Sequence, residues 1–185
     1  MRRANPPPLV EVRDPNLSSA RLRDLAQDPC EIVRRGVARH PKTPAETLRD
    51  LLDDRDCWVP WNLAQNPAAP AELLKELVSR RCFLEQVAAN CGAPGELLAR
   101  LARDPDVRVR AAAALNPATP TGALLDPAGD EVQPVRWCAA SYTAAPPGLL
   151  ERLASDWDEK VRRAVARNRN TPKQLKTSLK QAMGM

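Results

Sequence analysis

One short pattern recurs six times along the chain and constrains its fold more than any other feature. A large apolar residue marks each copy, and the steps between copies are 26, 24, 26, 26 and 26 residues: Val33, Val59, Phe83, Val109, Val135 and Val161. Alanine always stands five residues later: Ala38, Ala64, Ala88, Ala114, Ala140 and Ala166. Proline always stands eleven residues later: Pro44, Pro70, Pro94, Pro120, Pro146 and Pro172. A fixed period of this length indicates a repeat protein.

Each repeat has the signals of two short helices. The recurring proline is expected to open the first helix, and Thr43-Pro44-Ala45-Glu46 has the pattern of a capping box. The second is expected to start at an aspartate, as at Asp28-Pro29 and Asp104-Pro105. Seven residues after the apolar residue stand His40, Asn66, Asn90, Asn116, Tyr142 and Asn168, and asparagine there favours a left-handed helix end. Short helices bury their apolar faces only by stacking, so the sequence predicts an all-α solenoid.

The same register predicts how the chain is divided. We expect an N-terminal cap at 1–17 and a capping helix with its tail at 170–185. The six repeats between them are expected at 18–41, 42–67, 68–91, 92–117, 118–143 and 144–169. Two repeats are irregular: Pro60 is expected to truncate the second helix of repeat two, while Pro127, Gly129 and Pro134 disrupt repeat five.

The stretch DPDVRVRAAAALNPATP, with DEKVRRAVARNRNTP and DPCEIVRRGVARHPKTP, resembles the leucine-rich repeat variant family over about residues 18–179. The resemblance implies a right-handed superhelix of alternating α- and 3₁₀-helices without β-sheet. Some members of that family hold an iron–sulfur cluster on four N-terminal cysteines. This sequence has no cysteine before Cys30, so we expect no cofactor.

The spacing of aspartate and arginine is also similar to that of HEAT repeats. Helical geometry places these arginines on the inward face, where a guanidinium needs a carboxylate or carbonyl partner. We expect a structural ladder, with the aspartate of the same or a neighbouring repeat as the partner. Its members are Asp28, Arg34, Asp104, Arg110, Asp130, Arg136, Asp156 and Arg162. Pro60 and Leu84 at the arginine position, and Arg80 at the aspartate position, interrupt it.

The outward face of the second helices is the candidate binding surface. It carries Trp58, Trp61, Trp137, Arg35, Arg39, Arg108, Arg163 and Arg167. Tryptophan and arginine dominate binding hot spots, so our first hypothesis is a non-enzymatic scaffold that binds another protein. The alternative for Trp61 and Trp137 is that their rings fill the space at repeat junctions.

A second hypothesis is a nucleic-acid-binding solenoid. Its arginines would have to form one groove, namely Arg35, Arg39, Arg108, Arg163 and Arg167. From Lys160 onward the sequence has eight Lys or Arg and no acidic residue, and its net charge is +5. Such a basic end fits either a solvated cap or an anionic partner.

Catalytic and metal-binding patterns are weak. The single histidine, His40, stands at a helix end, and no glycine-rich phosphate loop is present. Trp157 between Asp156 and Asp158 is the one weak hint of an enzyme. The five cysteines, Cys30, Cys57, Cys82, Cys91 and Cys138, form no CxxC pair, and we expect most to be buried and inert. We therefore expect no enzyme, no metal, no membrane segment and a cytoplasmic location. The sequence does not determine the oligomeric state.

Overall fold

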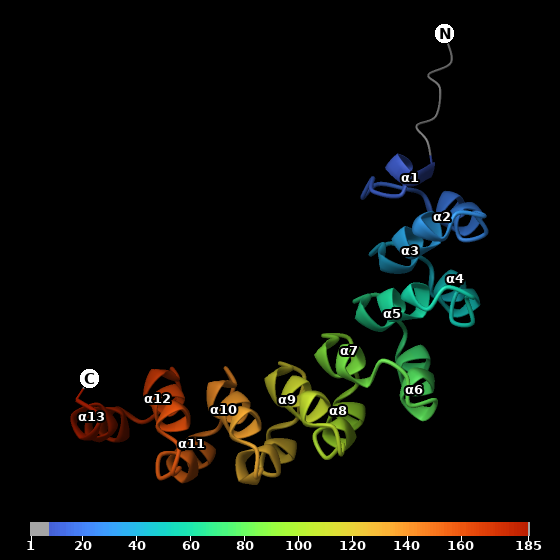
Figure 1. The fold of residues 1–185 in the computed structure, drawn as a ribbon. Coiled ribbons are helices and arrows are strands. Elements are labelled where there is room, and N and C mark those ends of the chain that lie inside the picture. The colour runs from blue at the N-terminus through green and yellow to red at the C-terminus, as the bar shows by residue number, and fades with distance from the viewer. Residues whose placement is uncertain (1–7, 185) are drawn as a thin grey trace. The chain divides into compact units, whose positions relative to one another are not determined.

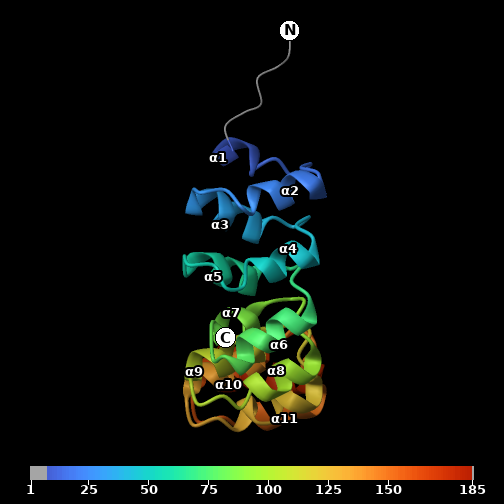
Figure 2. The same cartoon turned by 90° about the vertical axis from the view of Figure 1, so that its right-hand side faces the viewer.

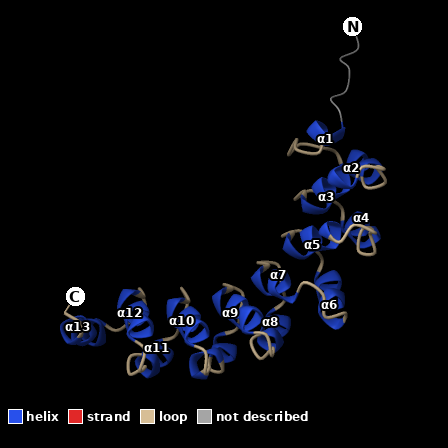
Figure 3. Cartoon of the chain, viewed as in Figure 1, coloured by secondary structure: helices blue, strands red, loops and turns tan. Residues whose placement is uncertain are grey.

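The computed structural model describes residues 8–184, and helices and turns account for all of that range, with no β-strand within it (Figures 1 and 3). The all-α fold is therefore confirmed. The chain divides into two compact units, residues 1–92 and 93–185. Residues 1–7 of the predicted cap and residue 185 of the predicted tail lie outside the described residues.

The N-terminal unit is a double row of helices. In Figure 2, α3 and α5 lie in one row and α2 and α4 in the other. The helices of this unit are α1 (Pro8–Glu11), α2 (Ser19–Leu25), α3 (Glu31–Arg39), α4 (Ala45–Asp50), α5 (Trp58–Gln65), α6 (Ala71–Ser79) and α7 (Leu84–Ala89). The second helices of successive repeats, α3, α5 and α7, thus pack on one another.

The C-terminal unit repeats this arrangement with one exception. Its elements are α8 (Gly95–Leu101), α9 (Val107–Leu115), η1 (Thr121–Leu124), η2 (Pro127–Gly129), α10 (Gln133–Ser141), α11 (Pro147–Leu153), α12 (Glu159–Arg167) and α13 (Lys173–Ala182). The exception is the first helix of repeat five, which is replaced by the 3₁₀-helices η1 and η2. Pro127 removes a backbone donor there, which favours two short 3₁₀ pieces over one α-helix.

Prolines within the second helices do not shorten them, contrary to the prediction for Pro60. Helix α5 runs from Trp58 to Gln65 with Pro60 as its third residue. Pro134 similarly occupies the second position of α10. Residues in the first turn have no intrahelical acceptor for their N–H groups, so proline costs no hydrogen bond at either place.

The Thr-Pro pairs do not form capping boxes. Each first helix begins one residue after its proline, and Thr43 makes no cap bond to α4. The Thr43 hydroxyl instead donates to the carbonyl oxygen of Val37 at 2.6 Å, in the last turn of α3. Thr119 and Thr171 make the same bond to Ala113 and Val165. These threonines therefore satisfy the C-terminus of the preceding helix rather than the N-terminus of the next.

The aspartates that were expected to begin the second helices, Asp28 and Asp104, lie in the turns before these helices. Asp28 Oδ1 accepts from the N–H of Cys30, and Asp104 Oδ1 accepts from the N–H of Asp106. Both carboxylates thus close a tight turn. Helix α9 begins only at Val107, and Asp106 is its cap.

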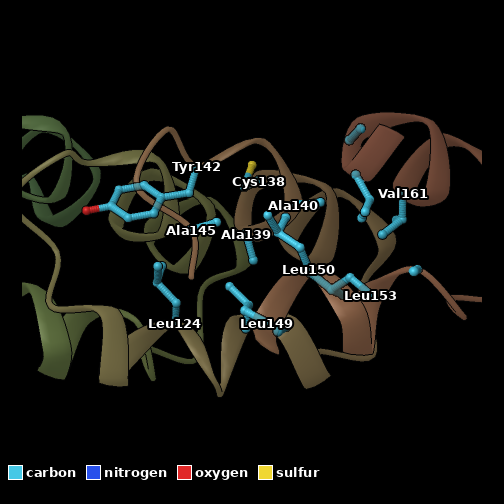
Figure 4. Close-up of a cluster of buried hydrophobic side chains, with 14 of the residues drawn as sticks. Leu124, Cys138, Ala139, Ala140, Tyr142, Ala145, Leu149, Leu150, Leu153 and Val161 are labelled. Carbon is cyan, nitrogen blue, oxygen red and sulfur yellow. The ribbon is translucent and has the colours of Figure 1, made fainter. Parts of the chain in front are cut away.

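The core is aliphatic and is built from fixed positions of each repeat. Leucines four residues after the proline, such as Leu98 and Leu150, are fully buried, as are the alanines of the second helices. Figure 4 shows this packing in the C-terminal unit, where Leu149 and Leu150 lie near Ala139 and Ala140. Because the alanines are small, helices of two to three turns can approach closely enough to exclude water.

The residues seven places after the apolar residue of each repeat, which we call the asparagine column, join consecutive repeats. They are His40, Asn66, Asn90, Asn116, Tyr142 and Asn168. Asn66 has an extended backbone with φ −70° and ψ 120°, so the expected left-handed conformation is wrong. Its Nδ2 donates to the carbonyl oxygens of Ala38 (2.7 Å) and His40 (3.1 Å) in the preceding repeat. Its Oδ1 accepts from the N–H of Ala68. Asn90 and Asn168 form the same pair of bonds to the repeats before them.

The two non-asparagine members of the column act in the same way. The Tyr142 hydroxyl lies 2.9 Å from the carbonyl oxygen of Pro117 and 3.0 Å from that of Thr119, and its single hydrogen is shared between the two acceptors. His40 ends α3, as expected, and its Nε2 lies 3.0 Å from the carbonyl oxygen of Asp14. Each side chain therefore reaches back by about one repeat to bind backbone carbonyl groups.

Removing one member of this column should destabilise the fold. We predict that Asn66→Ala lowers the free energy of unfolding by about 2–4 kcal/mol, because two carbonyl groups lose their donor. Asn66→Asp should cost more, since it places a carboxylate against both carbonyl oxygens. Urea unfolding followed by circular dichroism measures both. Gln65→Ala, an exposed neighbour, is the control and should change stability by less than about 0.5 kcal/mol.

Candidate functional site

A row of arginine–aspartate pairs crosses the repeat boundaries. Arg34 Nε and Nη2 donate to the two carboxylate oxygens of Asp54 at 2.6 and 3.0 Å. Arg110 makes the same bidentate contact with Asp130, and Arg136 with Asp156. Each arginine therefore pairs with the aspartate twenty residues later, in the following repeat.

The remaining edge of each guanidinium binds backbone. Arg34 Nη1 donates to the carbonyl oxygens of Asp28 (2.8 Å) and Pro29 (3.1 Å), in the turn that precedes its own helix. Arg162 Nη1 makes the corresponding bonds to Asp156 and Trp157. The aspartate of the same repeat thus contributes its carbonyl group, and the aspartate of the next repeat contributes its carboxylate.

Asp54 is a ladder residue that the sequence reasoning missed. It stands 26 residues after Asp28 and could have been found from the period alone. The same spacing of twenty residues explains the interruption at Pro60. Pro60 has no guanidinium, and the residue twenty places later is Arg80, which binds Asp53 and Glu76 instead.

The ladder lowers the pKa values of its carboxyl groups. The hydrogen bond from Arg34 lowers the pKa of Asp54, and this effect outweighs the opposing effect of burial. Burial tends to raise the pKa of Asp156, but hydrogen bonds from Arg136 and the Asp158 N–H leave that pKa below its ordinary value. The pairs are buried, with side-chain exposures of 7% and 8% for Arg34 and Asp54, so both charges depend on each other.

The residues around Trp157 do not form a catalytic cleft. Asp156 is bound to Arg136, while Asp158 Oδ1 accepts from the N–H groups of Lys160 and Val161 at the start of α12. The Trp157 ring is 75% exposed and lies against the Arg136 guanidinium, 4.5 Å from centroid to Cζ. Its contact is a cation–π interaction on a structural ion pair.

In the N-terminal unit, the outward face of α3 and α5 carries an aromatic pair. The Trp58 and Trp61 rings meet edge to face with centroids 5.2 Å apart. Trp58 is 49% exposed, whereas Trp61 is half-buried. Ile32 on α3 is also 49% exposed. Trp58 is therefore exposed on the outward face, whereas Trp61 is closer to the alternative in which the ring fills space at a repeat junction.

A cleft of about 430 Å³ lies beside this pair and is lined by residues of α1, α3 and α5 and of the segments that follow α1 and α3. Its lining is apolar with a basic rim: Leu9, Val12, Ile32, Arg13, Arg35, Arg39 and Asn62 belong to it. Arg35 is paired with Asp56, while Arg13 and Arg39 form no ion pair with a described residue. Gly36 allows the approach of α1, because a Cβ there would lie 2.7 Å from the Val12 side chain.

In the C-terminal unit, the corresponding face carries Trp137 (41% exposed) and Leu115 (47% exposed). Two of the three predicted arginines here already have carboxylate partners. Arg108 binds Asp106 at 3.0 Å, and Arg163 binds Glu159 at 2.7 Å. Arg167 is exposed at the end of α12.

The described residues offer no metal centre: no three His, Cys, Asp or Glu side chains gather there. All five cysteines are free thiols. Only Cys138 is buried, with a pKa raised by burial to about 11, while Cys57 and Cys91 are exposed. The expectation that most are buried is therefore wrong. Among the described helices, none combines the length and apolar character needed to cross a membrane.

Comparison with known proteins shows what the repeat resembles. A family profile described as leucine rich repeat variant matches residues 33–56, which span α3, α4 and the turn that holds Asp54 and Asp56. A solved structure, described as a leucine-rich repeat variant with a novel repetitive protein structural motif, is 26% identical in sequence. It aligns over 92% of this chain and 73% of its own, with a TM-score of 0.61. The chain thus resembles the leucine rich repeat variant in sequence over residues 33–56 and in fold over most of its length.

A second solved structure, an engineered protein, is 17% identical over 80% of this chain and 76% of its own, with a TM-score of 0.28, which is too low to indicate a shared fold. No curated protein matches the sequence significantly. Leucine-rich variant repeats do not belong to a known enzyme family, and repeat folds of this kind are often used for interactions. The matched region contains both the ladder aspartate and the Arg35 partner, so the repeat signature includes the residues that join neighbouring repeats.

Breaking one ladder pair should remove a pH-dependent part of the stability. We predict that Asp54→Asn lowers the free energy of unfolding by about 3 kcal/mol at pH 7, because Arg34 stays buried without its counter-charge. The folded-state pKa of Asp54 is lowered, so its contribution is present above about pH 4 and lost as the pH falls through that lowered value.

Urea unfolding at pH 7 and at pH 3 tests this prediction. The difference between wild type and Asp54→Asn should shrink at the lower pH. Asp53→Asn is the matched control, because Asp53 belongs to an exposed ion pair with Arg80, and its effect should stay below about 1 kcal/mol. An equal loss from both substitutions at pH 7 would contradict the role given to the buried pair.

Proposed function

We propose that this protein is a non-enzymatic scaffold that binds another protein on the outward face of its second helices. The observation that carries the proposal is a set of large apolar side chains exposed at outward positions of these helices. They are Ile32, Trp58, Leu115 and Trp137, each between 41% and 49% exposed. Partly exposed aromatic residues with flanking arginines are typical of hot spots in protein interfaces.

The cleft beside α3 supports the proposal. Its volume lies within the range of roughly 300–1,000 Å³ that is usual for ligand sites, and Trp58 and Trp61 lie on the adjacent helix. An apolar side chain of a partner could enter between Leu9 and Ile32, both of which are exposed. Arg39 at the rim would then be available for a polar group of the partner.

The contacts favour a protein over nucleic acid as the partner. The second hypothesis requires five arginines to bind phosphates, but Arg35, Arg108 and Arg163 are already paired with carboxylates. Releasing each from its partner would offset part of the gain from a phosphate contact. The exposed tryptophans fit a protein partner without any such exchange.

The test is a double substitution of the two most exposed outward tryptophans. We predict that Trp58→Ala/Trp137→Ala keeps the circular dichroism spectrum and loses the partners that wild type retains in affinity capture from cell extract. The expected loss in affinity is at least about tenfold, since hot-spot tryptophans each contribute about 2 kcal/mol or more.

Trp157→Ala is the matched control, because Trp157 is more exposed but lies on the ladder rather than on the outward face. It should retain the same partners. If the double variant retains them and Trp157→Ala loses them, the outward face is not the binding surface. Labelled DNA and RNA, titrated at several salt concentrations, test the second hypothesis in the same series.

A further inference from the structure

The ladder contains a guanidinium, that of Arg162, which is held like the others but pairs with no carboxylate of residues 8–184. Arg162 Nη1 donates to the carbonyl oxygens of Asp156 (2.7 Å) and Trp157 (3.0 Å). Arg136 Nη1 binds Asp130 (2.9 Å) and Glu131 (3.0 Å) in the same way. Because a guanidinium is planar, these bonds also orient its Nε–Nη2 edge. That edge holds an aspartate in Arg34, Arg110 and Arg136.

The residue twenty places after Arg162 is Ala182, which has no carboxylate. Ala182 is the last residue of α13. The equivalent helix of the preceding repeat, α11, is shorter: it ends at Leu153, and the turn after it carries Asp156. No described carboxylate lies within ion-pair distance of Arg162. Arg162 is only partly buried, so a carboxylate from outside the described chain can reach its free edge.

Two lysines lie on the same side of α13. In five repeats, the residues four and eight places after the opening proline are buried: Leu48, Leu52, Leu74, Val78, Leu98, Ala102, Leu124, Ala128, Leu150 and Ala154. In α13 these places hold Lys176, which is half-buried, and Lys180, which is exposed. The companion positions, Leu175 and Leu179, pack toward the core of the unit.

Since Leu175 and Leu179 face the preceding repeat, Lys176 and Lys180 occupy the positions that face onward. Figure 1 shows α13 on the side of α12 away from α10. We call the free edge of Arg162 together with Lys176 and Lys180 the distal face. From Lys160 to the end of the sequence no Asp or Glu is present to neutralise it.

We propose that the distal face binds an acidic segment of another protein, with an Asp or Glu side chain paired to Nε and Nη2 of Arg162. The chemistry is that of the three ladder pairs, in which a planar carboxylate meets both donors. The two lysines add long-range attraction for a segment with several acidic residues. A polar cap needed only for solubility would have no use for a guanidinium fixed in carboxylate-binding geometry.

The distal face is distinct from the outward face of the second helices, so either binding proposal can be wrong while the other holds. The probe is a short fluorescein-labelled peptide of alternating Asp, Ala and Glu, titrated with the full chain and followed by anisotropy. A peptide with Asn and Gln in place of Asp and Glu is the neutral control, and labelled single-stranded DNA is the second anionic probe.

We expect the acidic peptide to bind wild type and the neutral peptide not to bind. Arg162→Lys should weaken the acidic peptide by about tenfold, because an ammonium cannot form the bidentate contact. Lys176→Ala/Lys180→Ala should weaken it and reduce its salt dependence. Lys42→Ala/Lys75→Ala removes the same charge from the N-terminal unit and should leave binding unchanged, as should Trp58→Ala/Trp137→Ala.

Three results would overturn the proposal. The first is that Arg162→Lys binds the acidic peptide as tightly as wild type does. The second is that both lysine double variants lose the same affinity for the peptide. The third is that the DNA binds more tightly than the peptide and that Arg162→Lys weakens both to the same degree. Thermal melts of all variants accompany the titrations. Lys176→Ala/Lys180→Ala alters only side chains without described partners, so its binding result stands even where Arg162→Lys lowers the melting temperature.

Discussion

Backbone carbonyl groups at the ends of short helices must be satisfied, and here the neighbouring repeat supplies the donors. The second helices have only six to nine residues, so a large share of their carbonyl groups lies in the last turn. Asparagine, tyrosine or histidine side chains reach back across the repeat boundary to bind them. Arginine reaches forward across the same boundary to the next aspartate. These two sets of contacts fix the register of each repeat on the next within both compact units.

This dependence explains which irregularities the array tolerates. Pro60 replaces an arginine, and the aspartate that would have been its partner is replaced by Arg80, so no buried charge is left without a counter-ion. Repeat five loses its first α-helix to η1 and η2 but keeps Asp130, which holds Arg110. The turns that carry the ladder are thus preserved where the helices themselves vary. Arg162 is unusual by the same reasoning, because its bonds to the backbone are present but no carboxylate of the described residues pairs with it.

Periodicity made the helical repeat predictable, because six copies of one register allow only a stacked arrangement of short helices. The detailed roles of the polar residues were not predictable in the same way. Asn66 and Thr43 were assigned to local caps, yet both bind groups in another turn that only the folded repeat brings close. Local sequence shows a residue's preference for a helix end but not which end it serves. Asp54 was missed because ladder aspartates were sought six residues before an arginine, and Pro60 stands at that place in repeat two. The cysteines were misjudged because Cys57 precedes α5 and Cys91 lies in the turn after α7, so neither belongs to a buried helix face.

The binding surfaces proposed here all depend on repeats held in register, so the central claim concerns the contact between repeats. A double-mutant cycle on Arg136 and Asp156 tests it most directly, using Arg136→Ala, Asp156→Ala and the double variant in urea unfolding at pH 7. Both side chains are only 5% exposed, so the account predicts a coupling free energy of about 2 kcal/mol or more. A coupling near zero, with the two single losses simply adding, would show that apolar packing alone sets the register and would contradict the account.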